Sequence, residues 1–141
     1  MGSQQFITSE SPEIVIHSAR GDLIIRGWQR SEVLVRSDES SSAQQNEKGC
    51  SFAFDDDATI QLPVGASLRI GDVSGDLVLA GVYGDVQVAK VRGSADVREV
   101  GPLRMDGVDD DLSVRGVRGD CSIGGVGDDA TVSGVGGALK I

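Results

Sequence analysis

A nine-residue phrase recurs through the second half of the chain and constrains the fold more than any other feature of the sequence. Each phrase places apolar residues at its first, fifth and seventh positions, as in Val82, Val86 and Val88. Side chains two residues apart lie on the same face of a β-strand, so each phrase predicts one short strand. The phrases are VSGDLVLAG (73–81), VYGDVQVAK (82–90), VRGSADVRE (91–99), the shortened VGPLRMDG (100–107), VDDDLSVRG (108–116), VRGDCSIGG (117–125), VGDDATVSG (126–134) and the incomplete VGGALKI (135–141).

Pairs of apolar residues two positions apart continue upstream of these phrases and predict fourteen strands in all. Residues 36–49 interrupt the spacing and are predicted to form a polar loop, because Ala43 is their one apolar side chain. Residues 1–12 are predicted to be an N-terminal tail, and residues 13–141 a single domain. The pairs are Ile14/Ile16, Leu23/Ile25, Val33/Val35, Phe52/Phe54, Ile60/Leu62, Leu68/Ile70, Leu77/Leu79, Val86/Val88, Ala95/Val97, Leu103/Met105, Leu112/Val114, Cys121/Ile123, Ala130/Val132 and Leu139/Ile141.

The third and fourth positions of the phrase are most often Gly-Asp, as at Gly75-Asp76. Glycine tolerates positive φ at a corner, and an aspartate carboxylate accepts backbone N–H groups that a corner leaves unpaired. Short strands joined by such corners are typical of an all-β, parallel β-solenoid, either a β-helix or a β-roll. Two phrases per coil would give two sheets, and three phrases would give a three-sided coil. The chain has only 4% aromatic residues, which favours two sheets, because aliphatic side chains fill the gap of about 10 Å between them.

The composition argues against several classes of partner. The chain has 22 acidic and 13 basic residues, so nucleic acid and anionic membranes are expected to be repelled. No apolar run approaches the ~18 residues of a membrane span, and residues 1–16 lack the pattern of a signal peptide. The chain as given is therefore expected to be cytoplasmic, with envelope or surface association expected only if it is part of a longer protein.

Three segments together resemble a known family. They are GDLIIRGW (21–28), EVLVR (32–36) and, after the polar loop, IQLPVGASLRIGDVSGDLVLAGVYGDVQV (60–88). In this order they are similar to the bacterial adhesin-like family of unknown function, whose members carry V-x-G-D β-strand repeats. The resemblance covers roughly residues 13–141 and implies the fold and an adhesin-like role. It brings no catalytic residues.

The fourth-position aspartates are expected to form ladders along the corners, where their simplest role is to accept backbone N–H groups. A second interpretation is a calcium-binding β-roll, because a hard cation relieves the repulsion between stacked carboxylates. GGVGDDATV (124–132) comes nearest to the nonapeptide pattern of such a roll. The weak candidate ligands are Asp109, Asp110, Asp111, Asp128 and Asp129, and no other cofactor is predicted.

No catalytic site is predicted, because His17 is the one histidine and no second base near neutrality can complete a triad. Two cysteines are too few for a disulfide framework, and Cys121 falls at an inward position as a small core residue. Trp28 is expected to plug the N-terminal end of the core. The sequence therefore predicts a non-enzymatic structural or interaction module that meets a protein or cell-surface partner. The candidate contact residues are Tyr83, Leu139 and Ile141.

A different hypothesis is a scaffold that polymerises head to tail. Leu139 and Ile141 are apolar, fall at predicted inward positions and stand at the end of the repeats. Unpaired strands at the ends of a repeat protein can pair with another copy, and a contact between unlike ends need not close.

Overall fold

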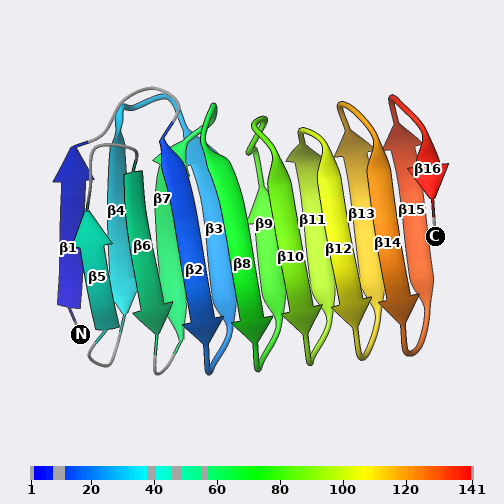
Figure 1. The fold of residues 1–141 in the computed structure, drawn as a ribbon, viewed down its shortest axis with the longest axis horizontal. Coiled ribbons are helices and arrows are strands. Elements are labelled where there is room, and N and C mark those ends of the chain that lie inside the picture. Colours follow the sequence, from blue (N-terminus) through cyan, green and yellow to red (C-terminus); the bar gives the residue numbers. More distant parts are fainter. Residues whose placement is uncertain (1, 8–11, 38–40, 46–48, 55–56, 141) are drawn as a thin grey trace.

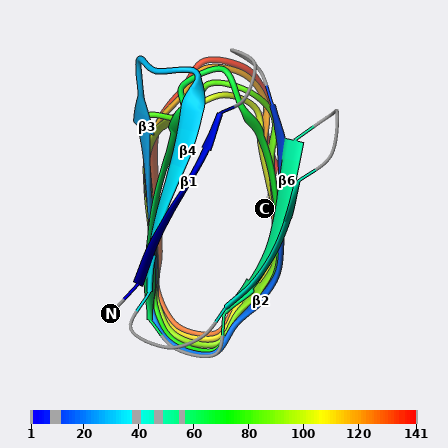
Figure 2. The ribbon, with the colours of Figure 1, turned by 90° about the vertical axis from the view of Figure 1, so that its left-hand side faces the viewer.

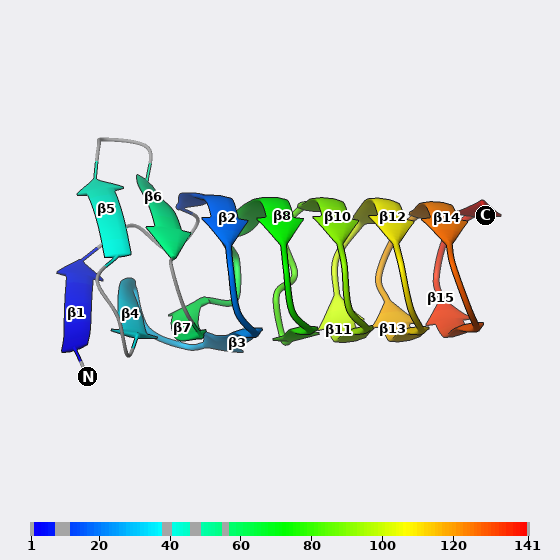
Figure 3. The same cartoon turned by 90° about the horizontal axis from the view of Figure 1, so that it is seen from below.

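The computed structural model describes residues 2–7, 12–37, 41–45, 49–54 and 57–140. These residues form sixteen strands and no helix. The strands make two eight-stranded, largely parallel sheets that lie face to face (Figures 1 and 3). The all-β prediction is thus confirmed, and two sheets are found rather than three.

Each sheet collects strands from both halves of the chain. Sheet A contains, in spatial order, β1 (Gly2–Ile7), β4 (Glu32–Ser37), β7 (Ala58–Pro63), β3 (Leu23–Trp28), β9 (Leu77–Ala80), β11 (Ala95–Val100), β13 (Leu112–Val117) and β15 (Ala130–Val135). Sheet B contains β16 (Leu139–Lys140), β14 (Cys121–Val126), β12 (Leu103–Val108), β10 (Val86–Val91), β8 (Ser67–Val73), β2 (Glu13–Ala19), β6 (Gly49–Phe54) and β5 (Ser41–Gln45). The apolar pairs predicted from the sequence all fall in these strands, except that Ile141 lies outside the described residues.

From β8 onward the chain passes alternately between the two sheets, and each strand pairs in parallel with the strand two places on. Val86 of β10, for example, lies opposite Leu68 of β8 and Leu103 of β12. Equivalent side chains therefore stack in straight rows. One passage of the chain through a strand of sheet B and the following strand of sheet A is called a coil below. Viewed along the stack, the sheets form the long sides of a flattened ring (Figure 2).

The space between the sheets is filled by rows of aliphatic side chains. One row of sheet B consists of Ile16, Ile70, Val88, Met105 and Ile123, and all are buried. Phe52 and Phe54 of β6 are the largest side chains of the core and lie near its N-terminal end. Removing these side chains from water is the main force that holds the sheets together.

The two cysteines lie in the inward row next to this one. Cys50 and Cys121 are both buried and free, as predicted for Cys121. They occupy equivalent positions five strands apart in sheet B, which separates them by about 24 Å at the usual strand spacing. A disulfide between them is therefore sterically impossible.

The N-terminal end of the stack differs from the prediction. The predicted tail contains β1, which pairs antiparallel with β4, and the predicted polar loop contains β5, which pairs antiparallel with β6. Strands at the edge of a sheet can form through backbone hydrogen bonds without an alternating apolar face, so the sequence pattern did not reveal them. Phe6 packs edge-on against Phe52, with 5.6 Å between the ring centroids.

The order of coils along the stack also departs from the order in the sequence. Strand β2 pairs in parallel with both β6 and β8, so the coil β2–β3 lies between β6–β7 and β8–β9. Trp28, at the end of β3, is half-buried rather than a plug of the core. Its indole N–H donates a hydrogen bond to the carbonyl oxygen of Glu32 at 2.7 Å, which fixes the connection to β4.

The corner glycines are required for a reason other than the predicted tolerance of positive φ. A Cβ on Gly75 would lie 2.3 Å from Oδ1 of Asp22, and one on Gly84 would lie 2.2 Å from the carbonyl oxygen of Ala66. These glycines are needed because adjacent coils approach closely. Positive φ occurs instead at the ninth position of the phrase, as at Gly81, where φ is 73°.

Candidate functional site

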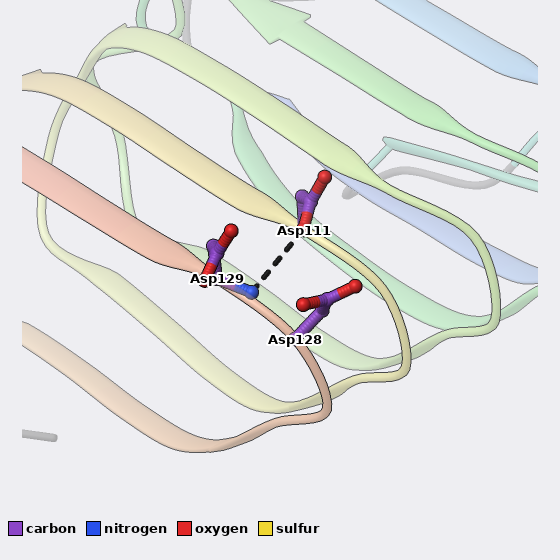
Figure 4. Close-up of side chains that lie close together, drawn as sticks. All are labelled: Asp111, Asp128 and Asp129. Carbon is purple, nitrogen blue, oxygen red and sulfur yellow. Dashed lines mark hydrogen bonds between the residues drawn. The ribbon is translucent and has the colours of Figure 1, made fainter.

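Three of the five predicted calcium ligands come together at one corner. Single carboxylate oxygens of Asp111, Asp128 and Asp129 lie within 4.8 Å of one another, and all three side chains are exposed (Figure 4). Asp109 instead forms an ion pair with Lys90 at 3.3 Å. Asp110 is not part of the group, and its backbone N–H donates to the carbonyl oxygen of Gly93.

The geometry of this group is that of a corner cap. Oδ1 of Asp111 accepts the backbone N–H of Asp129 from the next coil at 3.2 Å. Calcium takes six to eight oxygen ligands, of which this group offers three. A calcium ion held here would need further oxygen ligands, from second carboxylate oxygens, backbone carbonyls or water.

The same hydrogen bond is made at other corners and links several neighbouring coils. The predicted capping role of the fourth-position aspartates is confirmed by these bonds, in which an aspartate Oδ1 accepts a backbone N–H of the neighbouring coil. The pairs are Asp57 with Asp22 (2.7 Å), Asp22 with Asp76 (2.9 Å), Asp76 with Ser94 (2.9 Å) and Asp120 with Ala138 (2.9 Å). Opposite Asp85 the next coil has Pro102, which has no N–H to donate.

Tyr83, predicted to be an exposed contact residue, is half-buried. The guanidinium carbon of Arg118 lies 3.9 Å from its ring centroid, in cation–π geometry. Tyr83 and Arg118 are two coils apart, and the coil between them has Gly101 at the equivalent corner position. The glycine leaves room for the arginine to reach the ring, so one face of Tyr83 is covered.

The other predicted contact residues are Leu139 and Ile141. Leu139 of β16 is 46% exposed, and Ile141 lies outside the described residues. Val132 and Val135 of β15 are only half-buried, whereas the equivalent Val114 and Val117 of β13 are at most 2% exposed. Within the described residues, the β15 edge of sheet A therefore presents apolar side chains, and β15 has a neighbouring strand on one side only.

The charges of the chain are divided between corners and faces. The corner that leads from sheet B into sheet A carries eight described aspartates and two arginines. The outer face of sheet B from β8 to β16 carries four cations and two anions, which are Arg69, Lys90, Arg104, Lys140, Asp72 and Asp106. Negative charge is therefore concentrated at this corner, whereas the outer face of sheet B carries more cations than anions.

The outer face of sheet B contains a groove of about 320 Å³. Arg69, Gln87 and Arg104 form one wall, and Gly71 and Ala89 form the floor. His17 and Asp106 also line the groove. Sequence reasoning missed this feature, because its residues come from strands that are far apart in the chain and meet only through the register of the sheet.

The described residues contain no helix that is long and apolar enough to span a membrane. Comparisons with protein-family models, with curated proteins and with solved structures find no match to this chain.

Proposed function

We propose that the chain is a β-solenoid that acts as a non-enzymatic interaction module for a protein or cell-surface partner. The observation that carries this proposal is the pair of outer faces, on which side chains stand in straight rows at constant register across successive strands. Such faces present the same spacing of groups over a long distance, which suits a partner that is itself extended or repetitive. The adhesin-like sequence resemblance points in the same direction.

The reactive side chains of the described residues support the non-enzymatic part of the proposal. His17 is exposed on the outer face of β2. Burial raises the pKa of the Cys50 and Cys121 thiols above the ordinary value of 9.0, so neither is a ready nucleophile at neutral pH. Oδ1 of Asp22, Asp76 and Asp120 each accepts a backbone N–H.

A binding panel with an activity assay tests this proposal. The purified chain is passed over immobilised polysaccharides, extracellular proteins and lipid vesicles at low and at physiological salt, and the same ligands are assayed for cleavage. Saturable binding without turnover is the expected result. Cleavage of a panel member, or the absence of binding to every member at low salt, would contradict the proposal.

A second candidate function, self-association, is favoured by the open edge at β15. Strand β15 carries no charged residue, and charges are a common means of preventing edge-to-edge pairing. At the opposite end of the stack the antiparallel strands β1 and β5 occupy the sheet edges. Because β1 and β5 carry no charged residue either, the β15 edge of one copy can contact the opposite end of another copy, as the predicted head-to-tail assembly requires, or a second β15 edge.

Sedimentation velocity over a concentration series tests self-association. Val132→Lys places a charge on the half-buried row at this edge, and it should abolish any dimer. Ser113→Lys, on the outer face of the neighbouring β13, is the matched control and should leave the dimer intact. A monomer at every concentration of the unmodified chain would rule out this candidate.

A further inference from the structure

The wall of the groove on sheet B belongs to a longer row with a regular alternation. Arg69, Gln87, Arg104, Ser122 and Lys140 lie opposite one another in register on five consecutive strands. Neighbouring strands are about 4.8 Å apart, so the three cations are spaced by about 9.6 Å, with a neutral hydrogen-bonding residue between each pair. The row runs along the long axis of the molecule (Figure 1).

The cations of this row are available to a ligand. Among the described residues Arg69 forms no ion pair. Arg104 lies 3.8 Å from Asp106, but both side chains are more than two-thirds exposed, and such surface pairs contribute little. A ligand carboxylate could therefore replace Asp106 as the partner of Arg104 at little cost in free energy.

The packing of the strands keeps large side chains out of the floor of the groove. A Cβ on Gly71 would lie 2.3 Å from the carbonyl oxygen of His17, so this position accepts only glycine. The next floor position is Ala89, and the equivalent position on β14 is Gly124. Small residues thus run beside the row of cations on β8, β10 and β14, and Asp106 occupies the equivalent position on β12.

The geometry points to a linear acidic polysaccharide as the ligand of this groove, with one carboxylate on every second sugar. Its carboxylates would meet Arg69, Arg104 and Lys140, and the intervening sugar hydroxyls would meet Gln87 and Ser122. This inference rests on the proposed function. It names the class of ligand that the interaction module binds and the face of the molecule that binds it.

Two other extended polymers fit the row less well. Side chains on one face of an extended peptide are spaced by about 6.8 Å, which matches neither one nor two strand spacings. A nucleic acid strand carries a charge about every 3.4 Å, and Asp72, Asp106 and the acidic corner would repel so dense a charge. A sparsely charged polymer avoids this repulsion.

Isothermal titration calorimetry at low salt tests the inference. The probe is a hexasaccharide of alternating glucuronate and N-acetylglucosamine, and a neutral cello-oligosaccharide and a thymidine oligonucleotide of similar length are the comparison ligands. The expected result is binding of the acidic hexasaccharide alone. Arg69→Gln with Arg104→Gln should weaken this binding at least about tenfold, because two charge-assisted contacts are lost.

Two matched variants locate the site. Arg98→Gln with Arg115→Gln removes the same charge from the outer face of sheet A and should leave the affinity within about twofold. Ala89→Phe fills the groove without changing charge and should abolish binding, whereas Ala80→Phe on sheet A should not. Circular dichroism establishes that each variant is folded.

Three results would overturn the inference. They are tighter binding of the oligonucleotide, an equal loss of affinity in the sheet A variants, and no binding of the acidic hexasaccharide by the unmodified chain. If the chain then still binds another member of the wider panel, the interaction module stands and only its ligand or face is wrong. If it binds no member, the proposed function fails as well.

Discussion

The strongest test of the backbone geometry concerns Glu99, which lies at a position that is glycine in the equivalent strands. Residues 81, 99, 116 and 134 occupy equivalent positions in sheet A, directly after β9 and within β11, β13 and β15. Gly81, Gly116 and Gly134 have φ of 73°, 74° and 68°, and Glu99 has φ of 49°. Among the described residues Glu99 is the one non-glycine residue with positive φ. Glu99→Gly is therefore expected to stabilise the fold.

The magnitude follows from two opposing terms. A non-glycine residue in the left-handed region costs about 1–2 kcal/mol, and Glu99→Gly would remove this strain. Glycine loses more conformational entropy on folding than other residues, which costs about 0.5–1 kcal/mol. The net gain in the free energy of unfolding is about 0.5–1 kcal/mol. Gly81→Ala should cost a similar amount, because the nearest atom to a new Cβ would be 3.6 Å away and no clash adds to the strain.

Urea unfolding followed by circular dichroism measures this effect. With a slope of about 2 kcal/mol per molar, the midpoint for Glu99→Gly should rise by about 0.3–0.5 M with the slope unchanged. The control is Glu99→Ala, which removes the same carboxylate but keeps the left-handed strain. If the alanine variant is stabilised as much as the glycine variant, the gain comes from relief of negative charge, and the argument from φ is wrong.

Three further predictions concern the corners and the thiols. Ser94→Asp should add about 0.5–1 kcal/mol to the free energy of unfolding by restoring a missing cap, and Asp76→Ala should remove about 1–2 kcal/mol, both measured by urea unfolding. Stability should fall as pH rises above about 9, because the buried thiols of Cys50 and Cys121 have raised pKa values and the folded state then holds more protons. The double alanine variant of these cysteines should lose less stability over the same pH range. Millimolar calcium should leave the melting temperature unchanged, because Oδ1 of Asp111 already accepts the backbone N–H of Asp129, and a rise that Asp128→Asn removes would show the opposite.

The regular part of the fold could be predicted because one physical pattern determines it. Apolar residues two apart, as in Val86 and Val88, must face the core, and this requirement placed the strands. The number of sheets was predicted from the scarcity of aromatic side chains. Strands β1 and β5 escaped prediction because they are held by backbone pairing, as between Phe6 and Val33, and carry no alternating apolar pattern. The position of β2–β3 inside the stack also could not be predicted, because a repeat specifies register and leaves the order of coils open.

The candidate site was less accessible to sequence reasoning for the same reason. Asp128 and Asp129 are adjacent in the chain, so their proximity to Asp111 could be expected from the repeat. Arg69 and Lys140 are 71 positions apart in the chain and align only when every intervening strand is placed in register. A groove made of single residues from successive strands leaves no local motif to recognise.

The acidity of the chain follows from how its corners are held together. Each stacked corner leaves a backbone N–H unpaired, and Asp22, Asp76 and Asp120 satisfy such groups across the gap between coils. A chain that repeats this device accumulates carboxylates along its corners whatever its ligand. Part of the excess of negative charge is then a consequence of the fold, and it disfavours densely anionic partners without identifying the ligand. The informative charges are those that no backbone group requires, and they are the cations on the outer faces.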